Sequence, residues 1–172
     1  MSLRYALLGL LADRPASGYD LLQRFKESLA NVWPATQSQI YTELTKLADA
    51  GSIEVSDEGP RGRKEYTITD AGLADLREWL TTTKPKRSAR NETLLRVFFL
   101  GVVPAAYARD YLSGIGTETS KAREELAALE ASIDWEDNDL SVYGRIAMEW
   151  GKRFHAMNKE WAEWALTQIP ER

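Results

Sequence analysis

The sequence has no cysteine and only one histidine among its 172 residues. Without cysteine, disulfide bonds, thiol catalysis and cysteine-ligated zinc or iron–sulfur centres are excluded. His155 has no Glu or His three or four residues away that could share a metal with it, and a glycine-rich phosphate loop is also missing. We therefore expect no catalytic residues, no metal and no cofactor, and we expect His155 to lie on the solvated surface.

A long apolar run is missing as well. The longest one near the start, residues 6–12, is far shorter than the ~20 residues that a membrane-spanning helix needs. Asp13, Arg14 and Pro15 follow it directly, where a signal peptide would have small residues at its cleavage site. We therefore expect no membrane partner and a cytoplasmic location, which the lack of cysteine also fits.

The charges that are present are unevenly distributed. Residues 1–90 carry 13 Lys and Arg against 12 Asp and Glu, whereas residues 91–172 carry 9 against 14. This asymmetry predicts two modules, residues 1–88 and residues 89–172, in a chain long enough for two small domains. Residues 61–90 hold 8 basic and 4 acidic side chains. Such a local basic segment favours an acidic partner although the net charge of the whole chain is −4.

The first module begins with two predicted helices. The dense apolar run from Leu3 to Leu11 predicts a buried helix, which Pro15 ends. Ser17 is suited to cap a second helix beginning at Gly18. The predicted buried face of that helix consists of residues spaced three or four apart: Tyr19, Leu22, Phe25 and Leu29.

A third helix is predicted from the spacing of Thr36 and Gln39, which fits a capping box. Its buried face is predicted to hold Ile40, Leu44 and Leu47. Its opposite face is polar and nearly free of acid, and it carries Ser38, Thr42, Thr45 and Asp49, with Gln39, Tyr41 and Lys46 on the flanks. This composition is typical of a helix that contacts bases and phosphates, although an ordinary surface helix also fits it.

A β-hairpin is predicted next, because apolar residues alternate on both sides of a Gly- and Pro-containing loop, over residues 53–55 and 64–69. Three cations, Arg61, Arg63 and Lys64, lie at or beside its tip. On its own such a tip is a solvated turn; directly behind a helix-turn-helix it is a wing placed to meet phosphates or the minor groove. Thr69 and Asp70 then begin a fourth helix, with Leu73, Leu76 and Leu80 predicted to face inward beside Trp79.

The order of these elements is that of a winged helix-turn-helix, and the residues resemble the PadR family of transcriptional regulators. The similarity covers about residues 3–100 and rests on five local matches: Ser17 to Leu21, Val32 to Ala35, Gln39 to Leu44 with Leu47 and Gly51, Gly62 to Tyr66, and Thr69 to Gly72. The resemblance implies a DNA-binding homodimer, usually a repressor and often relieved by a small ligand. It also places Tyr41 on the family's recognition-helix tyrosine. Members of the family are often basic, whereas this chain is acidic.

The second module is predicted to be helical. Residues 81–90 form a basic linker, and Leu94 to Leu100 form a short helix that is apolar nearly all round and therefore predicted to be buried. Two long helices follow, over residues 104–133 and 139–169, with Gly114 and Gly116 expected to kink or interrupt the first. Apolar residues repeat strictly every three and four positions in each: Ala108, Leu112, Ile115, Thr119, Ala122, Leu126, Leu129 and Ile133 in the first, and Tyr143, Ala147, Trp150, Phe154, Met157, Trp161 and Trp164 in the second.

This spacing is the coiled-coil pattern. The further apolar residues Ile146, Ala165, Leu166 and Ile169 widen the face, so a second copy of the chain is the simplest partner. Long dimer helices of this kind resemble the carboxy-terminal domain of the larger PadR-family members. Two interpretations of Trp150, Phe154, Trp161 and Trp164 stay open: a core or dimer interface, or a cavity for a small apolar or phenolic effector.

The predicted fold is therefore mostly α with a small β-hairpin wing: a winged helix-turn-helix followed by a long-helix dimerisation domain. The predicted function is that of a sequence-specific DNA-binding transcriptional regulator, a ligand-responsive repressor acting as a homodimer on a palindromic operator. The alternative is a winged-helix module that binds proteins and has no affinity for DNA. The predicted contacts with double-stranded DNA are Gln37, Ser38, Gln39, Tyr41, Thr42, Lys46, Arg61, Arg63 and Lys64.

Overall fold

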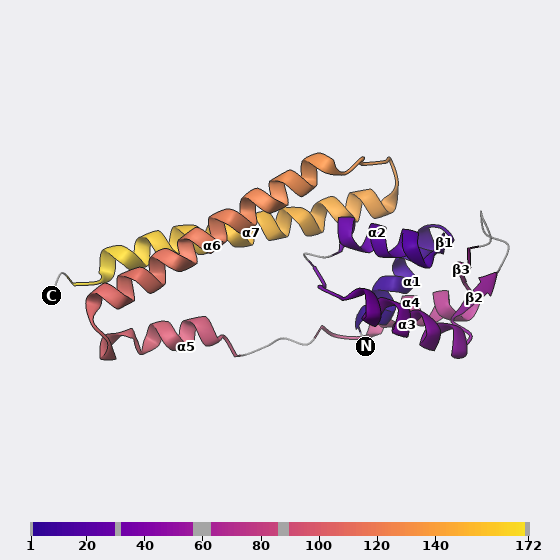
Figure 1. Cartoon of the computed structure of the whole chain (residues 1–172), viewed down its shortest axis with the longest axis horizontal. Coiled ribbons are helices and arrows are strands. Elements are labelled where there is room, and N and C mark those ends of the chain that lie inside the picture. The colour runs from indigo at the N-terminus through magenta and orange to yellow at the C-terminus, as the bar shows by residue number, and fades with distance from the viewer. Residues whose placement is uncertain (1, 30–31, 57–62, 86–89, 171–172) are drawn as a thin grey trace. The chain divides into compact units, whose positions relative to one another are not determined.

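The fold is mostly helical, with one small sheet, as the sequence predicts. Figure 1 shows the computed structural model of the chain, which describes residues 2–29, 32–56, 63–85 and 90–170. The chain divides into two compact units, Met1–Pro85 and Lys86–Arg172. No helix in the described ranges is long and apolar enough to cross a membrane.

The first unit is a winged helix-turn-helix. Its elements are α1 (Ser2–Asp13), β1 (Ala16–Ser17), α2 (Gly18–Ser28), α3 (Gln37–Asp49), β2 (Ile53–Ser56), β3 (Glu65–Ile68) and α4 (Asp70–Thr82). The hairpin β2–β3 is antiparallel, and the short strand β1 pairs antiparallel with the other side of β3, which gives the order β1-β3-β2. The sequence did not predict β1, because two residues are too few to show an alternating pattern.

Local signals set the ends of these helices as predicted. Ser17 caps α2, its hydroxyl accepting a hydrogen bond from the Asp20 amide, and both halves of the Thr36–Gln39 capping box are formed at α3. Helix α3 ends at Asp49, and Gly51 follows two residues later with a φ of 68°, which is unfavourable for a residue with a side chain. The amides of Gly51 and Ser52 donate to the last carbonyls of the helix, which is the Schellman arrangement.

The core of this unit lies between α1, α2 and α3. The predicted residues Ile40, Leu44 and Leu47 are all buried there. The other fully buried large side chains are Leu7, Leu8, Leu11, Leu21 and Phe25.

Two side chains in this unit were wrongly predicted to be buried. Tyr19 is 54% exposed, and Leu21 is fully buried in its stead, because α2 turns its Gly18–Leu21–Phe25 side toward the core. Leu80 is 64% exposed. The core near the end of α4 is instead covered by Trp79, whose ring stacks on Tyr5 of α1 at 4.5 Å between centroids.

The second unit holds α5 (Glu92–Phe98), a 3-10 turn η2 (Leu100–Val102), α6 (Ala105–Ser132) and α7 (Asp139–Gln168). Helices α6 and α7 run side by side as a hairpin (Figure 1). Two contacts fix their antiparallel order: Lys152 Nζ lies 2.8 Å from a Glu130 carboxylate oxygen, and Arg109 donates to the carbonyl of Ile169. Helix α6 runs through Gly114 and Gly116 without the predicted interruption.

The predicted seam of α6 faces α7, since Ala108, Leu112, Thr119 and Leu126 are buried. On α7 a different stripe faces α6. Its buried members are Met148, Ala162 and Ala165, and Gly151 comes close enough that an added Cβ would lie 3.1 Å from a Leu126 methyl group. Small residues let the two helices approach closely, which bulky aromatics would prevent.

The structure corrects two further predictions in this unit. Helix α5 has no buried residue; within one chain Leu94, Leu95 and Phe98 are exposed, Phe98 the most at 82%, and Val97 is half-buried. His155 is half-buried rather than on the open surface, and its ring meets Phe154 edge-on at 5.5 Å.

Candidate nucleic-acid interface

The outer face of α3 is exposed and polar. Gln37, Ser38 and Gln39 occupy its first turn, and Thr42, Thr45 and Lys46 follow along the same surface, all exposed. Gln39 also serves the capping box, its side-chain oxygen accepting from the Thr36 amide at 2.8 Å. The acidic residues of α3 are Glu43, which is half-buried 3.7 Å from Lys46, and Asp49 at the far end of the helix. The amino-terminal half of α3 therefore presents donors and acceptors without a carboxylate that would repel phosphate.

Tyr41 is seated against the start of α2. A Cβ added to Gly18 would lie 2.7 Å from Tyr41 Cε1 and 3.3 Å from Tyr41 Cζ and from its hydroxyl oxygen. The ring therefore lies directly over the Gly18 backbone. Tyr41 stays 37% exposed, so the seat leaves its outer edge open to a partner.

Tyr66, on strand β3 of the wing, lies near Tyr41 of α3. Burial raises the pKa of the Tyr66 phenol, and the nearby Tyr41 phenol raises it further. Tyr66 pairs with Val55 of β2 on one side and with Ala16 of β1 on the other, directly before the cap of α2. The wing is thus hydrogen-bonded to the strand that precedes α2 and lies near the exposed face of α3.

One cation of the wing, Arg63, lies beside α2. Arg63 and Lys64 are exposed and immediately precede β3. The Arg63 guanidinium carbon lies 5.7 Å from the centre of the Tyr19 ring, within the range of a cation–π contact. The third predicted cation, Arg61, lies outside the described residues.

A polar clamp holds α4 against the rest of this unit. Arg4 Nη2 donates to Asp75 Oδ2 at 2.6 Å and to Ser52 Oγ at 3.1 Å. The Tyr5 hydroxyl donates to the other Asp75 oxygen at 3.3 Å. Burial raises the pKa of the Tyr5 phenol, and the neighbouring Asp75 carboxylate adds to the rise. The clamp ties α1, α4 and the start of β2 together and so fixes the base of the wing.

The predicted aromatic cluster lies on surfaces of α7 that α6 does not cover. Trp150 and Trp164 are 68% and 59% exposed, and Trp150 stacks on Phe154 at 5.2 Å. Trp161 is half-buried. Within one chain Trp150, Phe154 and Trp164 are therefore exposed.

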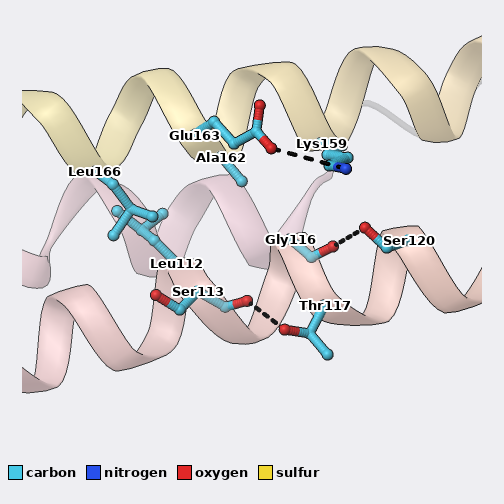
Figure 2. Close-up of a pocket in the computed structure, with 9 residues that line it drawn as sticks. All are labelled: Leu112, Ser113, Gly116, Thr117, Ser120, Lys159, Ala162, Glu163 and Leu166. Atoms are coloured by element: carbon cyan, nitrogen blue, oxygen red, sulfur yellow. Dashed lines mark hydrogen bonds and ion pairs between the residues drawn. The ribbon is translucent and has the colours of Figure 1, made fainter.

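A groove of about 380 Å³ lies elsewhere, between α6 and α7 (Figure 2). Its walls are formed by Leu112, Ser113, Gly116, Thr117, Ser120, Lys159, Ala162, Glu163 and Leu166. The Thr117 and Ser120 hydroxyls donate to carbonyls one turn earlier in α6, and Lys159 lies 3.8 Å from Glu163. These polar groups are engaged within their own helices, and none of the four aromatic residues lines the groove.

The structure thus brings α3 and the wing together, and it adds residues that sequence reasoning missed. Gly18, Tyr19 and Tyr66 had no predicted role at the interface. The signal for Gly18 was present: it precedes Leu22 by four residues, so it shares the inward side of α2, where only a residue without a side chain admits the Tyr41 ring. The contact between Tyr19 and Arg63 joins residues 44 positions apart and had no local signal.

Both units match known families. Residues 7–78 match the Transcriptional regulator PadR-like family, and residues 89–169 match the family described as Virulence activator alpha C-term. The chain is 35% identical over 136 residues to the Negative transcriptional regulator PadR of Bacillus subtilis, covering 77% of this chain and 73% of that protein.

Two solved structures of Bacillus subtilis PadR are similar over nearly the whole chain. The complex with operator DNA has a TM-score of 0.80 at 29% identity, covering 99% of this chain and 100% of that one. The complex with p-coumaric acid has a TM-score of 0.82 at 30% identity, covering 98% and 99%. These similarities confirm the predicted fold and the predicted family.

Proposed function

Because the chain belongs to the PadR-like family of transcriptional regulators, we propose that it acts in the cytoplasm as a sequence-specific DNA-binding repressor. In this proposal two copies bind a palindromic operator, and a small apolar or phenolic effector releases them. The observation that carries DNA binding is the exposed, acid-poor face of α3, together with the exposed cations Arg63 and Lys64 of the wing.

We place α3 in the major groove. Ser38 and Thr42 are exposed on its outer face and contact base edges; Tyr41 and Lys46 on its flanks contact phosphates, and Gln37 and Gln39 lie near the groove at the helix start. Arg63 and Lys64 contact phosphates from the wing, because they are exposed cations next to its tip. The similarity to a relative solved with operator DNA supports this placement.

A titration at several salt concentrations tests the proposal. The ligands are the DNA upstream of the chain's own coding sequence and a scrambled duplex of equal length. We expect Arg63→Ala to weaken both by a similar factor and to lower the slope of log K against log salt by about 1. We expect Thr42→Ala to weaken the upstream DNA selectively, by roughly 1 kcal/mol or more.

The matched control is Thr81→Ala, which removes an exposed helical threonine hydroxyl from α4, away from the proposed interface. It should leave both affinities unchanged. A wild-type chain that binds neither duplex, or binds without salt dependence, contradicts DNA binding and favours the alternative of a protein-binding module.

The homodimer is supported by the apolar surface of the second unit. The aromatic stripe of α7, from Tyr143 to Trp164, is about 32 Å long at 1.5 Å per residue. Most of its large side chains are exposed within one chain, as are those of α5. Monomeric proteins rarely leave so extended an apolar surface in water. A second copy related by twofold symmetry covers the surface and presents two α3 helices to the two halves of a palindrome.

Light scattering at micromolar concentration tests this assembly. We expect the wild-type chain to have twice the monomer mass, and Trp150→Glu to shift it toward the monomer, because a carboxylate at the centre of an apolar interface is left unpaired. Glu118→Ala, on the exposed surface of α6, is the control and should stay dimeric. A monomeric wild-type chain contradicts the proposal.

The effector is proposed from two observations. The relative with a similar fold was solved with p-coumaric acid, and the chain carries four aromatic residues on α7 that can form part of an apolar site once a partner covers them. We expect p-coumaric acid to release the protein from the upstream DNA in a gel shift, and cinnamic acid, which lacks the phenol, to do so less well. Equal binding at all concentrations of both acids contradicts a phenolic effector.

A further inference from the structure

The start of α2 contacts both parts of the proposed DNA interface. Gly18 lies under the Tyr41 ring of α3, and the adjacent Tyr19 lies against Arg63 of the wing. These contacts come from two successive residues that are held by the Ser17 cap and by the pairing of β1 with β3. Neither residue was placed in the interface by the sequence.

We infer that Gly18 and Tyr19 are positioning residues that set where Tyr41 and Arg63 stand relative to each other for DNA binding. The inference rests on the proposed function and adds to it the part of the molecule that aligns α3 with the wing. Gly18 acts by leaving space, and Tyr19 acts by holding a cation with its ring.

The role of Gly18 follows from steric contact. Its φ is not positive, so its backbone conformation is open to alanine. The obstacle to a side chain is Tyr41, since the three atoms nearest an added Cβ all belong to that residue, the closest at 2.7 Å. The methyl group of an alanine at position 18 therefore pushes the Tyr41 ring away from the Gly18 backbone. The exposed edge of the ring leaves room for that movement.

The role of Tyr19 follows from the geometry of the wing. Arg63 is exposed and lies just before β3, so little packing restrains it. The Tyr19 ring, with the Arg63 guanidinium carbon 5.7 Å from its centre, restricts the guanidinium to a position beside the start of α2. Phenylalanine presents the same aromatic face to a cation as tyrosine does. The contact with Arg63 therefore depends on the Tyr19 ring and not on its hydroxyl.

Two double-mutant cycles on the full chain test these roles, each with DNA affinity and melting temperature as readouts. In the first, Gly18→Ala should weaken binding to the upstream DNA by up to the factor lost in Tyr41→Ala, and should have no further effect in the Tyr41→Ala background. The melting temperature should show the same coupling without DNA, because Tyr41→Ala removes the clash. Gly9→Ala is the matched control: it lies in α1, has no atom within 4 Å of an added Cβ, and should leave affinity unchanged.

In the second cycle, Tyr19→Leu should weaken binding about two- to fivefold, the range of an exposed cation–π contact. It should also lower the salt slope toward that of Arg63→Ala, although the substitution removes no charge. Tyr19→Phe should bind like wild type. In the Arg63→Ala background, Tyr19→Leu should have no further effect.

The outcomes distinguish a failure of the positioning roles from a failure of DNA binding itself. Additive effects in either cycle, or Tyr19→Phe as weak as Tyr19→Leu, overturn the positioning role of that residue while DNA binding stands. A Gly18→Ala chain that fails to fold, and is not restored by Tyr41→Ala, also overturns the role of Gly18. A wild-type chain that binds neither duplex overturns the proposed function and, with it, this inference.

Discussion

Replacing Gly72 with alanine should reverse the effect that helix propensity alone predicts. Gly72 lies in the first turn of α4, where alanine is the better helix former by about 1 kcal/mol. An added Cβ would lie far inside contact distance of the Ser52 carbonyl oxygen, and that oxygen is backbone. The helix start cannot move aside freely, because the Thr69 amide donates to the same carbonyl at 3.1 Å and its hydroxyl donates to the Gly51 carbonyl at 2.8 Å.

The magnitude follows from these contacts. Overpacking a well-packed site costs about 1–3 kcal/mol, and we take the upper part of that range because the obstacle is main chain. Separating α4 from β2 by about 1 Å to restore contact distance also weakens one of the Thr69 hydrogen bonds, at about 1 kcal/mol. After the gain in helix propensity is subtracted, the net loss is about 2–3 kcal/mol, or roughly 10–20 °C in the melting temperature of this unit.

Urea and thermal denaturation followed by circular dichroism measure this loss, with Gly9→Ala as the control. Gly9 is also a helical glycine of the first unit, but an added Cβ there has no atom within 4 Å. We expect Gly9→Ala to be neutral or to stabilise by up to about 1 kcal/mol. Equal stabilisation by both substitutions would refute the reasoning that the Ser52 carbonyl, and not helix propensity, decides the effect at position 72.

Three further predictions concern single contacts. Thr36→Ala should lower the free energy of unfolding by about 1 kcal/mol, and Thr36→Ser by much less, since serine keeps the capping box that urea denaturation would report. Ala162→Leu should destabilise the second unit by about 1–3 kcal/mol in the same assay, because Ala162 is buried where α6 and α7 approach, whereas Ala128→Leu on the exposed surface of α6 should not. Lys152 bridges Glu130 and Glu149. Hydrogen bonds from Arg153 and Lys152 lower the pKa of Glu149. The contribution of the Glu149 carboxylate to the stability of the fold is therefore present above the unfolded pKa and is lost as pH falls through the lower folded pKa. The melting temperatures of wild type and Lys152→Met should therefore differ at pH 7, and the difference should shrink as the pH falls below about 4.3, the ordinary pKa of glutamate; a difference that does not change with pH would contradict an electrostatic contribution.

The sequence was sufficient to predict the features that depend only on residues close together along the chain. The capping box at Thr36 and the caps at Ser17 and Thr69 each satisfy backbone donors within three residues, so their effect does not depend on the rest of the fold. The buried face of α3 and the limits of α6 and α7 follow in the same way from apolar spacing and from helix ends. The candidate DNA contacts on α3 could be named for this reason: once the buried face is known, the outer face is fixed by the helical repeat.

For α7 and α2, only the tertiary structure decided which side of the helix faces the core. Helix α7 carries two stripes with the same three-and-four spacing, one aromatic and one of small residues, and periodicity cannot choose between them. The small stripe packs on α6 because Gly151 and Ala162 allow close approach, which leaves the aromatic stripe exposed within one chain. The same holds for α2. Tyr19 fits the apolar spacing of this helix, yet Leu21 is the residue buried in the core, and Tyr19 contacts Arg63, a residue 44 positions away. Spacing along a helix records which residues share a face, but the partner that covers the face comes from distant chain, and only the folded structure brings it there.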